Sequence, residues 1–260
     1  MKTVYILKLG ETFPSTKKKF GDFDTWIIKL LGKSNIKIKT INILNKQGLP
    51  NLQSAAGFIL TGSHSMVSDE LPWSLKIEKY IKKIASKDIP LLGICYGHQL
   101  IAKALGGRSS FNKNGKEIGR VKIKRSISSL TDPLFKGFPK EFYAFETHYQ
   151  SAIKLPTKAV VLASNSKDRH QAVRFTKQIW GVQFHPEFDI NIMKEYILHQ
   201  EETPNKLDLK VNHCTASNQI LSNFMSIVEE QELNLPSTNS FRGLPNESDT
   251  EEEELPLTFR

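Results

Sequence analysis

The sequence is poor in cysteine and has no long apolar run. Its 260 residues include two cysteines, Cys95 and Cys214, which are too few for a disulfide scaffold. No stretch approaches the length of a membrane span, and the residues after Met1 lack the apolar core of a signal peptide. These absences argue against a secreted disulfide-rich protein and against a membrane partner, so we expect a cytoplasmic chain.

Acidic charge is scarce except at the end of the chain. Lysine and arginine number 36 against 27 aspartates and glutamates, and six of these acids fall within residues 247–254. The lysines are spread over predicted helix faces without an aromatic-basic motif, so we expect no nucleic-acid partner. No group of His, Cys, Asp and Glu has metal-ligand spacing, and no glycine-rich phosphate loop occurs. We therefore expect no metal, no cofactor and no ATP-dependent step.

Short apolar strands alternate with amphipathic helices through the first half of the chain. The predicted strands lie at residues 3–7, 36–44, 57–60 and 90–94, and the predicted helices at 20–31, 73–87 and 96–105. This alternation predicts an α/β fold with a three-layer, flavodoxin-like sheet, mostly parallel and with helices on both faces. Functional residues are then expected at the carboxyl ends of the strands.

The second half is richer in strands. Five strand-like segments follow one another at residues 118–124, 141–145, 160–164, 171–175 and 179–184, before helical patterns at 190–200 and 218–230. We interpret the strands as a β-rich extension of the same sheet. The expected organisation is a domain over residues 1–200, an irregular segment with a docking helix over 201–230, and an acidic, disordered tail over 231–260.

Cys95 lies where a buried strand meets a helix, in the run LGICYGHQ that spans residues 92–99. Gly93 and Gly97 flank it at the positions where side chains would collide in a tight turn. Such a nucleophile elbow exposes the nucleophile at the N-terminus of a helix, whose backbone N–H groups favour a thiolate. A lone cysteine in such a turn is more often structural, but the glycines and a downstream histidine favour a nucleophile here.

The second informative run is FHPE at residues 184–187, where an apolar strand ends in polar groups. In an α/β sheet this puts His185 at the same edge as Cys95. The stiff Pro186 allows Glu187 to turn back onto the imidazole. A thiol nucleophile needs a base, and the base needs a group that orients it. Cys95, His185 and Glu187 can supply these three roles.

The two runs together resemble the class I (triad) glutamine amidotransferase family, in particular stand-alone enzymes related to the glutaminase domain of guanosine monophosphate synthetase. The resemblance covers residues 1–200. It implies that the thiolate attacks the side-chain amide of L-glutamine, releases ammonia and leaves a γ-glutamyl thioester, which water hydrolyses. It also implies an oxyanion hole formed by the N–H of Tyr96 and the turn Gly62–Ser63.

The resemblance further suggests which residues hold the amino-acid end of the substrate. Gln99, one helical turn after Cys95, matches the position whose side-chain amide binds there. The segment that contains Thr147, His148 and Tyr149 matches the loop whose backbone grips the α-amino and α-carboxylate groups. His148 is equally compatible with packing on a neighbour, and His98 is expected to be a packing residue.

Three functions remain open from the sequence. The chain is a glutaminase subunit that passes ammonia to a separate acceptor synthetase, or a stand-alone hydrolase of γ-glutamyl peptides or conjugates. The third function is a catalytically idle regulatory module on the same scaffold, against which the intact triad argues. The acceptor, the oligomeric state and the role of the tail do not follow from the residues.

Overall fold

The computed structural model describes residues 2–45, 47–200 and 212–234. The α-helices are α1 (Pro14–Phe20), α2 (Phe23–Leu30), α3 (Pro72–Ala85), α4 (Tyr96–Ala104), α5 (Ile190–Gln200) and α6 (Thr215–Leu233). The strands are β1 (Thr3–Lys8), β2 (Lys37–Asn42), β3 (Ala55–Leu60), β4 (Leu91–Ile94), β5 (Arg108–Phe111), β6 (Glu117–Arg125), β7 (Glu141–His148), β8 (Gln150–Lys154), β9 (Val160–Ser164), β10 (Ala172–Thr176) and β11 (Ile179–Val182).

Nine strands form one sheet in the order β2-β1-β3-β4-β11-β10-β9-β6-β7. The strands from β2 to β11 pair in parallel, and each pairing from β11 to β7 is antiparallel. Strands β5 and β8 form a separate antiparallel pair. The predicted α/β fold, with a parallel sheet and a β-rich extension, is confirmed.

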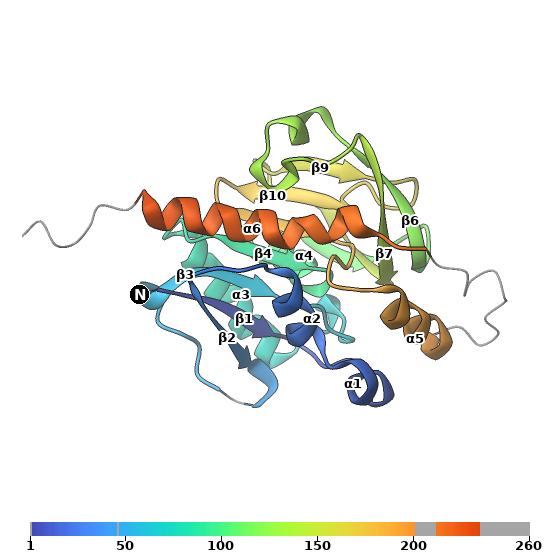
Figure 1. The fold of residues 1–260 in the computed structure, drawn as a ribbon, viewed down its shortest axis with the longest axis horizontal. Helices are drawn as coiled ribbons and strands as arrows, with labels where there is room; N and C mark the ends of the chain where they lie inside the picture. Colours follow the sequence, from blue (N-terminus) through green and yellow to red (C-terminus); the bar gives the residue numbers. More distant parts are fainter. Residues whose placement is uncertain (1, 46, 201–211, 235–260) are drawn as a thin grey trace, which may run out of the picture.

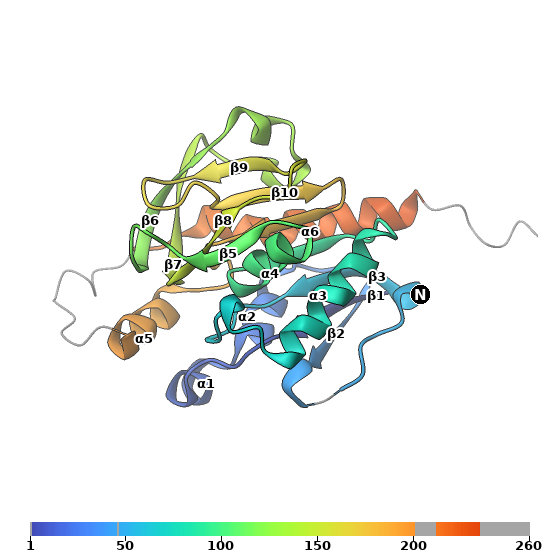
Figure 2. The ribbon, with the colours of Figure 1, turned by 180° about the vertical axis from the view of Figure 1, so that it is seen from behind.

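Helices cover both faces of the sheet, as expected. Helices α2 and α6 lie on the face seen in Figure 1, and α3 and α4 lie on the opposite face (Figure 2). The alternation along β1 explains the two cores, because Val4 and Ile6 pack in the cluster that includes α6, whereas Leu7 packs in the cluster that includes α3 and α4. The sheet therefore buries apolar side chains on both faces.

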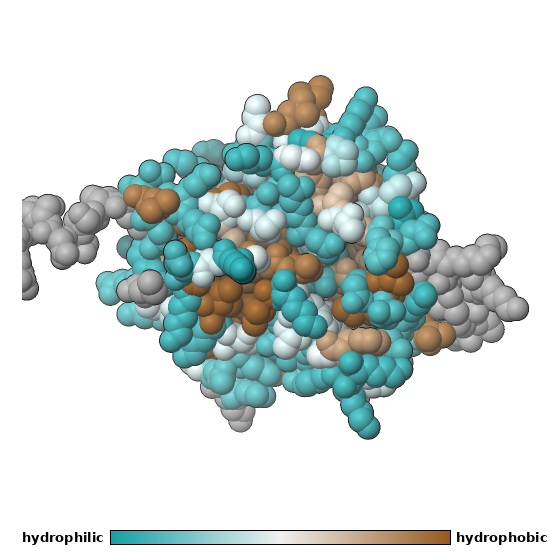
Figure 3. Space-filling model, in the orientation of Figure 1, coloured by the Kyte–Doolittle hydropathy of each residue, from teal (hydrophilic) through white to brown (hydrophobic). Residues whose placement is uncertain are grey.

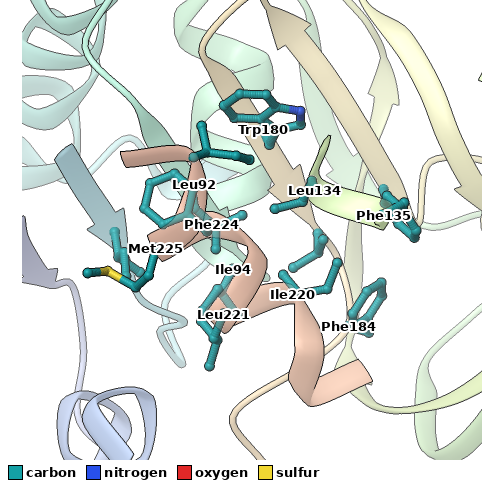
Figure 4. Packing of buried hydrophobic residues seen from close by; sticks show 14 of the residues in the cluster. Leu92, Ile94, Leu134, Phe135, Trp180, Phe184, Ile220, Leu221, Phe224 and Met225 are labelled. Carbon is teal, nitrogen blue, oxygen red and sulfur yellow. The ribbon is translucent and has the colours of Figure 1, made fainter. Parts of the chain in front are cut away.

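Helix α6 closes the core beside the central strands. Phe224 and Leu221 of α6 pack in one cluster with Leu92 and Ile94 of β4 and with Trp180 of β11 (Figure 4). These side chains are almost completely buried. Burial of large apolar side chains contributes about 1.5–3 kcal/mol each, so α6 is an integral part of the folded domain.

The structure adds elements that the sequence patterns did not indicate. The first is α1, whose sequence PSTKKKF has no apolar stripe but begins with a proline at the first helical positions. The others are β5 and β8, which are short and polar. Helix α6 begins three residues earlier and ends three residues later than predicted, so Gln231 to Leu233, assigned to the tail, are helical. The predictions for residues 201–211 and 235–260 lie outside the described residues.

The surface beside α6 has a mixed character. An apolar patch lies next to this helix and is surrounded by hydrophilic residues (Figure 3).

Within the described part of the chain, no helix combines the length and the apolar character that are needed to cross a membrane.

Candidate active site

Cys95 occupies a strained turn between β4 and α4. Its backbone has φ 49° and ψ −100°, a conformation that is uncommon for a residue with a side chain. The next residue begins α4, so the sulfur is next to a helix N-terminus. Strain of this kind persists where the surrounding structure enforces it, and it is concentrated at functional sites. The tight strand-to-helix turn that the sequence predicts at Cys95 is therefore present in the fold.

The two glycines that flank Cys95 are required by close backbone contacts. A Cβ atom at Gly93 would lie 2.5 Å from the carbonyl carbon of Gly97. A Cβ atom at Gly97 would lie 2.7 Å from both the Cβ atom and the carbonyl oxygen of Leu60 in β3. Such distances leave no room for a side chain, so these glycines allow α4 to pack directly on the sheet below Cys95.

Substitution of Gly97 by alanine is expected to destabilise the fold. The new methyl group must displace the backbone of Leu60, and overpacking of this kind costs about 1–3 kcal/mol, more than the gain in helix propensity. The melting temperature should fall by several degrees in a calorimetric scan. Gly48→Ala is the matched control, because no atom lies within 4 Å of its added Cβ. An unchanged melting temperature in Gly97→Ala would contradict this packing.

His185 follows β11 and is held by hydrogen bonds and by aromatic neighbours. Its backbone N–H donates to the carbonyl of Phe145 at 2.8 Å, and its Nδ1 lies 2.8 Å from Oε1 of Glu187. The ring stacks on Phe188 with 4.1 Å between centroids and lies 6.3 Å from the ring of Phe23, which also stacks on Phe188 at 6.4 Å. With Nδ1 donating to Glu187, Nε2 is the nitrogen that remains for a reacting group.

The charge of the His185 ring depends on two neighbours. Burial alone would lower the pKa of the imidazole, but the Glu187 carboxylate and the Cys95 sulfur outweigh burial and raise this pKa to about 10. His185 is therefore an imidazolium at neutral pH. An imidazolium beside a cysteine favours the thiolate, which is the nucleophilic form of the side chain. The side chains of Cys95, His185 and Glu187 are all buried.

A cavity of about 230 Å³ opens beside Cys95. It is smaller than the roughly 300–1,000 Å³ that is typical of pockets for drug-sized ligands, so it suits a small group. Its lining includes five predicted oxyanion and substrate residues besides His148, together with residues that were not predicted. The lining residues are Phe13, Ser63, His64, Ser65, Met66, Cys95, Tyr96, Gln99, Thr147, His148, Tyr149, Gln150 and Gln200.

The predicted oxyanion residues lie on two different elements next to Cys95. Tyr96 is the first residue of α4, and its hydroxyl is tied to Ser74 Oγ at 2.8 Å. Ser63 lines the cavity from the loop after β3. A Cβ atom at Gly62 would lie 3.1 Å from Cε1 of His185, so glycine permits this loop to approach the imidazole. Gly62 lies against His185 and is not among the residues that line the cavity.

The predicted substrate residues line the cavity, but one of them is already engaged. The Gln99 side-chain N–H groups donate to the carbonyl of Gln150 at 2.6 Å and to Oε1 of Gln183 at 3.0 Å. The side-chain N–H groups of Gln99 therefore connect α4 to Gln150 and Gln183. The side-chain oxygen of Gln99 is the group left for a ligand. Thr147 offers its carbonyl oxygen 4.0 Å from Cys95 Sγ. Tyr149 is partly exposed, with Lys116 Nζ 5.2 Å from its ring centroid.

His64 and Phe13 are cavity residues that sequence reasoning did not assign to the site. Phe13 packs on His64 with 4.4 Å between ring centroids, and His64 Nε2 lies 3.2 Å from the hydroxyl of Tyr196 in α5. Their signal is weak in the sequence, because Phe13 lies in a loop far from both motifs. His98, by contrast, packs on Phe175 as predicted, and burial lowers its pKa to about 3. It is a neutral core residue.

His148 is part of a buried acidic cluster that sequence spacing did not reveal. Its Nδ1 lies 2.9 Å from the carbonyl oxygen of Gln150, and its Nε2 lies 3.3 Å from Glu117 and 3.4 Å from Glu146. Burial and the nearby Glu117 carboxylate raise the pKa of Glu146 well above its usual range. Glu117, 29 residues before Glu146, reaches the cluster only because β6 pairs with β7. The sequence patterns did not indicate this pairing, and we therefore expected no group of metal ligands.

Comparison with known proteins identifies the family to which the chain belongs. The model of the family described as "Glutamine amidotransferase class-I" matches residues 20–203. The chain is 26% identical over 186 residues to γ-glutamyl peptidase 4 of Arabidopsis thaliana, which covers 70% of this chain and 74% of that protein. It is 30% identical over 204 residues to a glutamine-hydrolysing GMP synthase of Thermosipho africanus. That match covers 78% of this chain but 33% of the synthase.

Solved structures support the same fold. A glutamine amidotransferase of Thermotoga maritima superposes with a TM-score of 0.68 at 21% identity, covering 90% of this chain and 100% of that chain. A glutamine amidotransferase of Methylobacillus flagellatus gives a TM-score of 0.71 at 19% identity, covering 94% and 100%. At these identities the likeness concerns the fold.

Proposed function

The chain belongs to the class I glutamine amidotransferase family, and on that premise we propose that it releases ammonia from L-glutamine through a γ-glutamyl thioester on Cys95. One observation carries this proposal. Cys95 lies on a strained elbow at a small cavity, and the sulfur raises the pKa of the buried His185, which is in turn held by Glu187. These are the nucleophile, the acid–base group and the orienting group that amide cleavage by a thiol requires.

In the proposed reaction the Cys95 thiolate attacks the side-chain carbonyl carbon of glutamine. The negative charge moves to the carbonyl oxygen, which the backbone N–H groups of Tyr96 and Ser63 stabilise. The His185 imidazolium then gives its proton to the departing nitrogen, so that ammonia leaves and the thioester remains. Water, deprotonated by His185, attacks the thioester and releases glutamate with regeneration of the thiolate.

The other cavity residues are proposed to hold the amino-acid end of the substrate. Gln99 contributes its side-chain oxygen, because its N–H groups are engaged, and Thr147 to Tyr149 contribute backbone groups. The reaction as proposed needs no cofactor. As a glutaminase subunit, the protein would pass ammonia to a separate synthetase. We expect the protein and this synthetase to act in the cytoplasm.

A second function is favoured by the extent of one match. The chain spans 74% of γ-glutamyl peptidase 4 but 33% of the GMP synthase, which has a much longer chain. A self-sufficient peptidase would place the γ-glutamyl group in the cavity and the rest of its substrate against the rim, where Tyr149 is partly exposed. The first acyl-transfer step is the same, and the leaving group is an amino acid or conjugate rather than ammonia.

The test measures glutamate release from L-glutamine and from a γ-glutamyl dipeptide by the purified full chain. Release from glutamine that exceeds release from the dipeptide supports the proposed glutaminase. Faster cleavage of the dipeptide contradicts it in favour of the peptidase. Release from neither, with wild type and Cys95→Ala equal, contradicts the self-sufficient peptidase and points to a missing activating partner of the glutaminase subunit or to the idle regulatory module.

A further inference from the structure

Three buried side chains beside the active site form a group of potential metal ligands. Glu117 of β6 is directly paired with His148 of β7, and Glu146 is paired with Gly119, which has no side chain to fill the space. One donor atom from each of Glu117, Glu146 and His148 lies within 4.8 Å of the others. All three residues are more than nine-tenths buried.

The distances within this group fit a metal better than direct hydrogen bonds. His148 Nε2 lies 3.3 Å from Glu117 Oε2 and 3.4 Å from Glu146 Oε2. An N–H···O hydrogen bond is usually about 2.9–3.0 Å long. Two ligands of a tetrahedral zinc ion with bonds of about 2.0–2.1 Å are separated by about 3.3 Å. Both distances from His148 to a carboxylate therefore match the separation of neighbouring ligands in a tetrahedral site.

Neighbouring groups form hydrogen bonds with His148 and Glu117, as the groups around a metal site do with the metal ligands. His148 Nδ1–H donates to the carbonyl of Gln150 at 2.9 Å, which leaves the lone pair of Nε2 for a ligand bond. Glu117 accepts from Asn165 Nδ2 at 2.8 Å and from Gln171 Nε2 at 3.2 Å. Metal-binding histidines and carboxylates usually have such supporting hydrogen bonds.

Glu146 provides an independent indication. Its side chain is fully buried, and neither of its carboxylate oxygens has a hydrogen-bond donor among the described residues. A buried carboxyl group without a partner is costly, and a second carboxylate nearby increases that cost. A cation between Glu117, Glu146 and His148 would compensate both charges.

We propose that Glu117, Glu146 and His148 bind one divalent cation of the zinc type, with water as the fourth ligand. The donor set of one imidazole and two carboxylates suits zinc and related first-row ions. His148 also lines the cavity beside Cys95, which gives the ion a path of entry. The ion holds the end of β7, where the Thr147 carbonyl lies 4.0 Å from Cys95 Sγ. This proposal does not depend on the substrate of the enzyme.

Zinc binding to the full chain tests the site directly. The titration uses metal-free Cys95→Ala protein, so that the ion is not captured by the Cys95 sulfur, and a chromophoric chelator as competitor. We expect one zinc ion per chain. Adding Glu146→Gln should weaken binding by about 100-fold or more, because it removes a charged ligand with little change in size. Glu141→Gln, an exposed carboxylate on the same strand, is the matched control and should leave binding unchanged.

Cobalt serves as a second probe of the same site. Co²⁺ should give the intense visible absorption of tetrahedral coordination in Cys95→Ala protein and lose it when Glu117→Gln is added. Circular dichroism verifies that the variants are folded. Equal zinc affinity with and without Glu146→Gln would overturn the proposal, as would absence of stoichiometric zinc in the folded Cys95→Ala protein.

Discussion

Cys95→Ala is expected to abolish turnover while the protein remains folded. The substitution removes the proposed nucleophile, and loss of a nucleophile costs about 10⁴-fold or more in kcat. The fold should tolerate it because alanine is also small and apolar, and the side chain borders the cavity as well as the apolar core. Steady-state release of glutamate measures the effect, on whichever of the two substrates the wild type uses.

Cys214→Ala is the matched control for that experiment. Cys214 is the other cysteine of the chain, equally buried, and lies just before α6, outside the cavity. Its pKa is raised to about 11 by burial, so its thiol is neutral and a poor nucleophile at pH 7. Normal turnover in Cys214→Ala is expected. Residual activity in Cys95→Ala comparable to wild type would mean that another group performs the reaction.

The second large effect is expected at His185 and depends on pH. His185→Ala should lower kcat by about 10²–10⁴-fold, because it removes the group that is proposed to give a proton to the leaving nitrogen. In the proposed mechanism the imidazolium gives its proton in the first step, and burial is outweighed by Glu187 and Cys95, which raise the pKa of His185 to about 10. Activity should therefore persist above neutral pH and fall only as the pH rises through about 10.

Glu187→Gln separates the orienting role from the acid–base role. Removing the carboxylate takes away a charge that raises the pKa of His185, so the alkaline limb of kcat/KM should move to lower pH. The loss of kcat should be about 10- to 100-fold smaller than in His185→Ala, since water replaces the orienting group in part. Equal losses in both variants would show that Glu187 does more than orient the ring. An unmoved alkaline limb would show that Glu187 does not set the charge of His185.

The sequence predicted the site where its signals are local. Gly93, Cys95 and Gly97 lie within five residues, and the collisions that exclude a side chain at both glycines follow from the tightness of one turn. His185 and Glu187 are likewise two residues apart and hydrogen-bonded in the structure. The placement of both runs at the same edge followed from the alternation of strands and helices, because β4 and β11 are adjacent and parallel.

Features that depend on pairing between distant strands were not predictable. The Glu117–Glu146–His148 cluster requires the register of β6 against β7, which no short motif encodes. The side-chain amide of Gln99 donates hydrogen bonds to Gln150 and Gln183, which come from different strands and loops. Helix α1 was missed because its lysine-rich sequence lacks an apolar stripe, although it packs beside α5 (Figure 1) and directly follows Phe13, which lines the cavity.

The central claim is that Cys95 becomes covalently attached to a γ-glutamyl group. Mass spectrometry of the full chain, after reaction with a glutamine analogue that carries an electrophilic carbon at the γ-position, tests it most directly. We predict one adduct per chain, mapped to the peptide that contains Cys95, and strongly slowed formation in His185→Ala. An adduct on Cys214, or an adduct on Cys95 that forms equally fast in His185→Ala, would contradict the proposed thiolate–imidazolium pair.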